Sequence, residues 1–274
     1  LLAGTLLLWS VGKRKTSLIA LSLALLNLVE IVPLYQKPAV NTENRQLGFS
    51  LLQVNVLSQN QQYEQLMKEV RRLNPDVVVM EEITTEWYEA LAAVRQEYPY
   101  VVETLERSDL GVMVMSKIPL EKTELIDFND GRLPSLVTEL QVEGQPIRLI
   151  ATHPLSPRSK QNFKLRNQQL YAIAQAFSER DQPLMMVGDL NITSFSPIFK
   201  RFIREIDLYD SRKGFGVQPS WPARAWRIAR ISLDHCLLSP GLSVSQRKLG
   251  QYVGSDHLPV YVEIEFSAES IAGN

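Results

Sequence analysis

The stretch "MMVGDLNIT", residues 185–193, places an acid directly after an apolar run. Met185 to Gly188 predict a buried strand, which leads into Asp189 and, two positions further on, Asn191. A carboxylate is costly to bury unless it has a partner. Asp and Asn after a strand are also typical of a turn or a helix cap. Taken alone, the stretch leaves two interpretations: a strand ending in a turn, or a strand delivering an acid and an amide to an active site.

The composition is that of a globular protein with a substantial core. Of 274 residues, 45% are hydrophobic and 22% are charged. The formal net charge of −1 excludes an overall basic field of the kind that drives non-specific nucleic-acid binding. The single cysteine, Cys236, excludes an internal disulfide and a cysteine-based zinc site.

Residues 1–35 predict a membrane anchor. An apolar run at 1–11, interpreted as a truncated first span, is followed by the basic residues 13–15 and a second span at 17–35. The second run approaches the ~20 residues that cross a bilayer, and Glu30 falls near its interfacial end. A signal peptide and a buried core helix are the alternatives. However, an apolar segment precedes the basic cluster and the second run has no polar face. With that cluster in the cytoplasm, the rest of the chain lies outside it.

The remainder predicts a linker at 36–46, one catalytic domain at 47–267 and a tail at 268–274. Within the domain, short apolar strands alternate with amphipathic helices. Some strands are apolar throughout and others alternate, which indicates an α/β fold with mixed sheets covered by helices. The expected strands are 47–56, 75–82, 110–116, 135–142, 147–153, 184–188, 232–238 and 258–266, and the expected helices are 60–74, 86–98, 159–180 and 196–206.

Polar side chains recur at or near the ends of these strands. Each has an ordinary structural explanation when taken singly, such as a turn, a cap or a satisfied buried histidine. Their coincidence at strand ends predicts that they meet in one cleft. The set is Asn55, Glu82, His153, Asp189, Asn191, Asp234, Asp256 and His257.

The motifs "QVNV", "VVVMEEI", "ATHP", "GDLN", "LDH" and "SDHLPV" resemble those of the endonuclease/exonuclease/phosphatase superfamily, in the same order and approximate spacing. The resemblance covers residues 47–266, and with the anchor it is closest to a membrane-associated bacterial branch. It implies a four-layer αββα sandwich of two packed mixed sheets. The apolar segments at 1–35 place one or more N-terminal transmembrane helices before it. The glutamate motif here has Met-Glu-Glu in place of Leu-Gln-Glu, so Glu82 and not Glu81 is the matching carboxylate.

The resemblance also implies roles for the polar set. Glu82 would be the central ligand of a divalent metal, supported by Asn55 and Asp256, and hard oxygen ligands favour Mg²⁺ or Mn²⁺. Asp234 and His257 would form a dyad. Asp189 would orient or deprotonate a water, while Asn191 and His153 would hold phosphoryl oxygens.

Two neighbouring positions complete these expectations. Gly188 is expected to let the chain approach a phosphate closely. His235, next to Asp234 in a strand, should face the opposite way and be structural.

A loop at 212–230 combines five basic residues with two tryptophans, Trp221 and Trp226. Such a loop could contact a nucleic-acid strand, seat on an anionic membrane, or simply be solvated. From it Trp221 and Arg224 are candidate substrate-binding residues, and Arg132 is a further one.

We therefore expect a membrane-anchored, metal-dependent phosphoesterase that acts on a lipid-linked phosphate or a nucleic acid. It would lie in a bacterial inner or plasma membrane with its catalytic domain on the extracytoplasmic side. The alternatives are a Mg²⁺-dependent DNA endonuclease or exonuclease, and an anchored binding module without catalysis. No protein partner is inferred.

Overall fold

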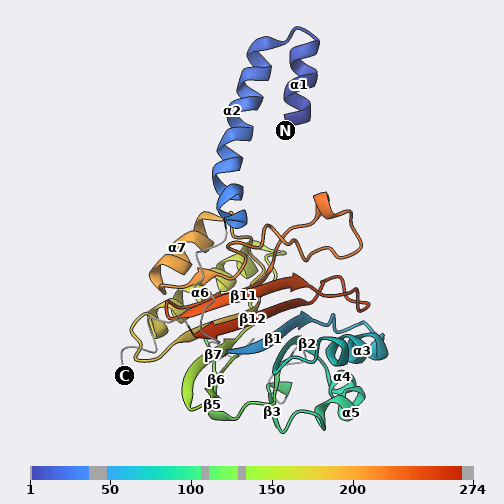
Figure 1. Cartoon of the computed structure of the whole chain (residues 1–274), viewed down its shortest axis with the longest axis vertical. Coiled ribbons are helices and arrows are strands. Elements are labelled where there is room, and N and C mark those ends of the chain that lie inside the picture. The colour runs from blue at the N-terminus through green and yellow to red at the C-terminus, as the bar shows by residue number, and fades with distance from the viewer. Residues whose placement is uncertain (1, 37–47, 106–110, 129–133, 267–274) are drawn as a thin grey trace. The chain divides into compact units, whose positions relative to one another are not determined.

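The computed structural model describes residues 2–36, 48–105, 111–128 and 134–266 (Figure 1). The chain divides into two compact units. The first comprises Leu1–Val40 with Arg212–Val217, and the second comprises Asn41–Ser211 with Gln218–Asn274. Among the expected site residues, Arg132 lies outside the described residues.

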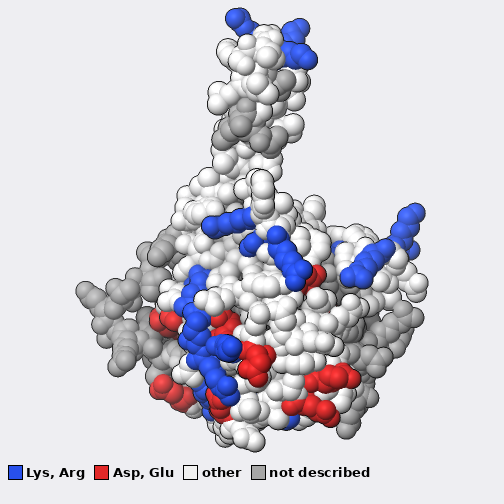
Figure 2. All heavy atoms as spheres, turned by 90° about the vertical axis from the view of Figure 1, so that its right-hand side faces the viewer, with Lys and Arg blue, Asp and Glu red and all other residues white. Residues whose placement is uncertain are grey.

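The first unit contains the apolar N-terminal segment. Helix α1 (Leu2–Ser10) contacts α2 (Arg14–Ile31), which continues as the 3-10 helix η1 (Val32–Tyr35). Arg14–Tyr35 is long and apolar enough to cross a membrane, with a mean hydropathy of 2.1. A signal sequence or a buried core helix would have the same length and composition. Figure 2 shows basic side chains at the turn between the helices and uncharged surface along the face in view.

The second unit contains two six-stranded sheets. One has the order β11-β12-β1-β2-β4-β3 and the other β5-β6-β7-β8-β10-β9. Both are mixed, because β1 and β2 pair parallel, as do β7 and β8, while the other pairs are antiparallel. The strands are β1 (Gly48–Asn55), β2 (Val77–Ile83), β3 (Tyr100–Glu103), β4 (Gly111–Ser116), β5 (Leu120–Ile126), β6 (Ser135–Val142), β7 (Gln145–Ala151), β8 (Leu184–Asp189), β9 (Tyr209–Asp210), β10 (Asp234–Leu238), β11 (Leu242–Leu249) and β12 (Val260–Phe266).

The two sheets pack face to face, and helices cover their outer faces. Strand β2 illustrates the arrangement, because Val77 and Val79 belong to the core between the sheets, whereas Val78 and Met80 pack under helices. Burial on both faces explains the continuous apolar run in this strand. The predicted four-layer sandwich is therefore confirmed. Helices α3 (Tyr63–Leu73), α4 (Thr85–Ala90) and α5 (Ala92–Arg95) cover the first sheet, and α6 (Lys160–Phe177) and α7 (Pro197–Glu205) cover the second.

Side-chain caps define where several helices begin. The side chain of Ser159 accepts a hydrogen bond from the amide of Asn162 at the start of α6. At the start of α7, the side chain of Ser196 accepts one from the amide of Ile198. The prediction of one helix over 86–98 was wrong, because Leu91, with φ −81° and ψ 4°, separates α4 from α5. Strands β3, β5, β9 and β11 were not anticipated from the sequence.

Candidate active site

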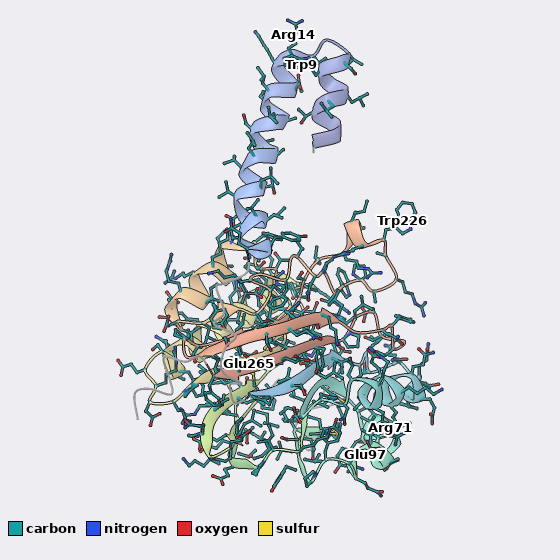
Figure 3. All side chains as sticks on the ribbon, in the orientation of Figure 1. Trp9, Arg14, Arg71, Glu97, Trp226 and Glu265 are labelled. Carbon is teal, nitrogen blue, oxygen red and sulfur yellow. The ribbon has the colours of Figure 1, made fainter. Side chains whose placement is uncertain are left out.

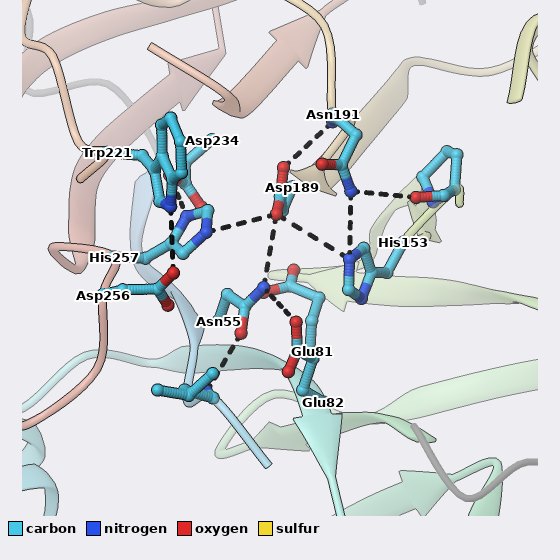
Figure 4. A network of polar contacts seen from close by, with 12 residues as sticks. Asn55, Glu81, Glu82, His153, Asp189, Asn191, Trp221, Asp234, Asp256 and His257 are labelled. Carbon is cyan, nitrogen blue, oxygen red and sulfur yellow. Dashed lines mark hydrogen bonds and ion pairs between the residues drawn. The ribbon is translucent and has the colours of Figure 1, made fainter. Parts of the chain in front are cut away.

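Strands of both sheets end at the same place and bring their polar residues together (Figure 4). Asn55 is the last residue of β1, and in the parallel register it lies beside Glu81 of β2. Asp189 is the last residue of β8, and in the antiparallel register it lies opposite Asp234, the first residue of β10. Each sheet therefore supplies about half of the candidate site.

Asp189 uses its two carboxylate oxygens differently. Oδ1 accepts a hydrogen bond from the backbone amide of Asn191 at 2.9 Å, which closes a local turn with Asn191 at φ 50°. Oδ2 accepts one from Nδ2 of Asn55 at 3.2 Å and lies 3.5 Å from Nε2 of His257 and 3.7 Å from Nε2 of His153. The stretch around Asp189 thus forms both a turn and part of a polar cluster.

His257 and Asp234 form the expected pair. Nδ1 of His257 lies 2.9 Å from Oδ2 of Asp234, and both side chains are buried. Burial disfavours the charged imidazole, but Asp234 and Asp189 outweigh it and raise the pKa of His257 to about 10. Burial likewise opposes ionisation of Asp234, but His257 outweighs it and lowers the pKa of Asp234 to about 2. The pair is therefore an imidazolium held by a carboxylate.

Glu82 reaches the site because β2 is irregular at this residue. The register against β4 shifts between Glu81 and Ile83, and Glu82 has φ 59°. Oε1 of Glu82 accepts a hydrogen bond from Nδ2 of Asn55 at 3.0 Å, and Oε2 accepts one from the amide of Ser58 at 3.2 Å. Burial works to raise the pKa of Glu82, but the charge of His153 and these hydrogen bonds outweigh burial, so the pKa is lowered.

Glu81 and Gln53 form a fully buried layer behind the dyad. Nε2 of Gln53 donates to Oε2 of Glu81 at 2.9 Å and to Oδ1 of Asp234 at 2.8 Å. Burial, followed by the charge of Asp234, raises the pKa of Glu81 well above its ordinary value. Sequence reasoning did not select Gln53. The available signal was its position two residues before Asn55, on the same face of a strand.

His153 and Asn191 lie on the other side of Asp189. Nδ2 of Asn191 lies 3.2 Å from Nε2 of His153 and donates to the carbonyl of Pro154 at 3.0 Å. The buried Arg166 of α6 donates to the backbone carbonyl of Asn191, which fixes the turn from behind. Burial raises the pKa of Asp189, although His257 and His153 oppose the rise.

The remaining candidates lie at the margin or outside the cluster. Asp256 is half-buried, and its Oδ2 accepts a hydrogen bond from Nε1 of Trp221 at 2.9 Å. Arg224 is exposed and donates to the hydroxyl of Tyr252 at 2.8 Å. Arg212, the first basic residue of the 212–230 loop, is fully buried and is therefore not a surface contact.

His235 faces away from the dyad, as expected from strand alternation. Its Nε2 lies 2.8 Å from the carbonyl of Ile192, and its ring packs against Phe199 with centroids 4.6 Å apart. These contacts place His235 in the layer between the second sheet and its helices, which is a structural position.

Gly188 approaches a neighbouring strand rather than an open site. It has φ 148°, and a Cβ there would lie 1.9 Å from the carbonyl oxygen of Thr152. This contact gives a reason for glycine that is separate from the expected approach to a phosphate.

The donors in the cluster suit a hard divalent cation. Asp189, Asp234 and His257 bring one potential ligand atom each within 4.8 Å of one another. As an imidazolium paired with Asp234, His257 has no lone pair for a metal, so the oxygen atoms of the cluster are its donors. Nδ2 of Asn55 lies between carboxylate oxygens of Glu82 and Asp189. Converging carboxylates with an amide favour Mg²⁺ or Mn²⁺ by donor type. Among the described residues, no hydrogen bond or ion pair links Asp256 to Asn55 or Glu82.

Comparison with known proteins identifies the family of this αββα sandwich and its polar cluster. Residues 52–257 match the profile of the endonuclease/exonuclease/phosphatase family. The chain therefore belongs to this family, whose members are generally phosphodiesterases or other hydrolases.

Individual relatives are distant. Phospholipase C of Staphylococcus aureus is 25% identical over 193 residues, which cover 58% of each chain. The chain thus spans somewhat over half the length of the curated relatives it matches. An endonuclease/exonuclease/phosphatase structure from Beutenbergia cavernae has a TM-score of 0.66 at 19% identity, covering 81% of this chain and 72% of that one. D. rerio TDP2 complexed with a single-strand DNA product has a TM-score of 0.66 at 18% identity, covering 80% and 99%.

Proposed function

We propose that this chain is a divalent-metal-dependent phosphoesterase anchored in a bacterial membrane by its N-terminal helix, with its site on the extracytoplasmic side. The observation that supports it most is the convergence on Oδ2 of Asp189. Asn55, His257 and His153 all lie within 3.7 Å of that atom, and Asn55 comes from the other sheet. A buried acid surrounded in this way is typical of a catalytic site rather than of a turn alone.

Glu82 and Asn55 are the residues that would hold the metal, with Asp256 at the margin. A bound divalent cation would neutralise a phosphate oxygen and the charge that develops on the leaving oxygen. Asn55 is already oriented toward Glu82 by its hydrogen bond, and Glu82 is kept ionised by its lowered pKa. Mg²⁺ or Mn²⁺ is the ion that this donor set favours.

The other residues act on the phosphate and the water. Asp189 would orient the attacking water and accept its proton, since its raised pKa makes it a better base than an ordinary aspartate. His257, held as an imidazolium by Asp234, would stabilise charge on a phosphoryl oxygen. His153 and Asn191 would hold another phosphoryl oxygen from the opposite side of Asp189.

The favoured substrate is a phosphoester at a membrane. The chain has a net charge of −1, and its segment Arg14–Tyr35 is able to cross a bilayer, so both features favour a membrane-proximal phosphate over nucleic acid. A Mg²⁺-dependent DNA nuclease is the second candidate. It is supported by the exposed residues Arg224, Arg227 and Trp226, because arginine with an aromatic ring binds nucleic-acid strands.

A panel of phosphoesters tests the proposal. Wild type and Asp189→Asn are incubated with plasmid DNA, an abasic oligonucleotide, a polyprenyl phosphate and a sphingolipid, each with Mg²⁺ and with EDTA. Asparagine keeps the acceptor oxygen that the turn needs and removes the charge. Asp181→Asn, an exposed carboxylate between α6 and β8, is the matched control.

We expect wild type and Asp181→Asn to hydrolyse a lipid substrate in Mg²⁺ only, and Asp189→Asn to lose about 10³-fold or more. Activity confined to DNA would establish the nuclease instead. Activity that survives in Asp189→Asn, or that EDTA leaves unchanged, would overturn the proposed site. A folded wild type that is inactive toward all four substrates would favour the binding module.

A further inference from the structure

The residues between Trp221 and Ile231 form an ordered, protruding loop, which we call the Trp226 loop (residues 222–230). Its two ends pair, because the amide of Trp221 donates to the carbonyl of Ile231 at 3.0 Å and the reverse bond measures 2.6 Å. Inside it, a 3-10 turn at Arg227–Ala229 and a hydrogen bond from Nε of Arg230 to the carbonyl of Ala225 at 2.8 Å fix the backbone. The side chains at its tip are therefore presented by a defined backbone.

The tip presents two large apolar side chains to solvent. Trp226 is 82% exposed and Ile228 is 92% exposed, the highest values for large hydrophobic side chains in the described part of the chain. Figure 3 shows Trp226 at the outer end of the loop, pointing away from the domain. A folded protein seldom leaves two neighbouring side chains of this size in water unless they contact a partner.

The loop is also locally basic. Residues 211–233 contain no Asp or Glu, whereas the loop carries Arg224, Arg227 and Arg230, with Arg227 between Trp226 and Ile228. Elsewhere basic and acidic side chains are mixed on the face drawn in Figure 2. An apolar tip with arginines close by in the sequence is the pattern of a segment that lies in the interface of an anionic bilayer, with tryptophan at the level of the headgroups.

The base of the loop forms part of the wall of the candidate site. Nε1 of Trp221 donates to Oδ2 of Asp256, and the amide of Ala223 donates to the carbonyl of Asp256 at 2.7 Å. The ring of Trp221 lies with its centroid 6.4 Å from that of His257. Whatever the tip contacts is consequently linked through a few hydrogen bonds to the residue next to His257.

We propose that the Trp226 loop docks on the headgroup region of an anionic lipid bilayer and so directs the site toward lipid phosphates. Nucleic acid would account for the arginines and the tryptophan, but it offers no apolar environment for Ile228, the most exposed of these side chains. The bilayer interface accommodates all of them. The docking itself stands on the loop alone, whereas its catalytic consequence rests on the proposed function.

A fluorescent probe at the tip tests the docking. Full-length protein with Ile228→Cys is labelled with an environment-sensitive dye and reconstituted in vesicles of phosphatidylcholine with or without phosphatidylglycerol. The native Cys236 is buried, and burial raises its thiol pKa to about 12, so the label goes to the new site. Tyr100→Cys, on the outer strand β3, is the matched control at another exposed large hydrophobic side chain.

We expect lipid-phase nitroxide to quench the Ile228 probe several-fold more in phosphatidylglycerol vesicles than in phosphatidylcholine alone, while the Tyr100 probe stays accessible to aqueous iodide in both. Arg227→Gln should remove most of the difference between the two lipids. The proposal is overturned if the Ile228 probe remains as accessible to iodide as the control. It is equally overturned if single-stranded DNA, and not lipid, protects the probe.

Activity separates the docking from the chemistry. In Trp226→Ser/Ile228→Ser, turnover of a vesicle-embedded phosphoester should fall about tenfold or more, while that of a soluble phosphoester stays within about twofold of wild type. An equal loss on both substrates would contradict the docking role. An inactive wild type whose probe still enters the bilayer would refute the proposed function and leave the docking intact.

Discussion

Gln53→Met is the sharpest test of how the dyad is positioned. Methionine has nearly the volume of glutamine, so the fully buried space stays filled while the amide donor is lost. Nε2 of Gln53 lies 2.8 Å from Oδ1 of Asp234, whose other oxygen is bound to His257. Gln53 therefore acts as a positioning residue, since it restrains rotation of the carboxylate that holds the imidazole.

The size of the effect follows from that single bond. A hydrogen bond to a charged group contributes about 1.5–3 kcal/mol. If its loss is expressed in the transition state, kcat falls about 10- to 150-fold. KM should remain within about twofold, because Gln53 is fully buried and the expected phosphate contacts come from other residues. The bond from Gln53 to Glu81 is also lost, so some stability is lost with it.

Gln169→Met is the matched control. Gln169 is another fully buried glutamine, but its Nε2 lies 3.2 Å from the hydroxyl of Thr152 and reaches no member of the dyad. Steady-state kinetics on the substrate identified by the panel, with urea unfolding of each variant, give the comparison. Equal kcat losses in the two variants, or an unchanged kcat in a folded Gln53→Met, would refute the positioning role.

Three further outcomes are expected. Gly188→Ala should destabilise the fold by about 2–6 kcal/mol in urea unfolding, because its Cβ would lie 1.9 Å from the carbonyl of Thr152 at a positive φ; a loss below about 1 kcal/mol would contradict that contact. Burial works to raise the pKa of Glu69, but hydrogen bonds from Arg72 and a backbone amide outweigh burial and lower that pKa. The stability that Glu69 contributes is therefore present above its ordinary pKa of 4.5 and is lost as the pH falls through its pKa in the folded protein. Unfolding followed from pH 7 to pH 3 should show Glu69→Gln approaching wild type in acid, whereas a constant gap would argue against the shift. His235→Gln should lower the melting temperature while kcat of the folded variant stays near wild type, and a selective loss of kcat would assign His235 to the site.

Much of the fold could be predicted because its central strands are buried on both faces. The apolar run of β2 and the amphipathic period of α3 follow directly from where each side chain packs. The missed strands are less regular in sequence. Strand β5 is largely exposed, and β11 is interrupted by a bulge between Val244 and Gln246, so neither has a clear apolar period.

The candidate site was accessible to sequence reasoning where acids and amides end strands, as with Asn55 and Asp189. Gln53 escaped although it opens the "QVNV" motif, because only Asn55 of that motif was given a role. Its importance arises from Asp234, which is distant in the sequence and close only after the two sheets pack. The sequence favoured a contact role over inward packing for Trp226, but it could not show how far this side chain projects into solvent.

The two carboxylate oxygens of Asp189 have different partners, and this difference has an evolutionary consequence. One oxygen closes the turn after β8, which any folded descendant requires, while the other faces the histidines, which only an active descendant requires. A lineage that lost the activity but kept the fold would still need an acceptor at this position and would no longer need its charge. Asparagine is the replacement that meets both conditions, so the residue at position 189 should distinguish working enzymes from folded, inactive descendants.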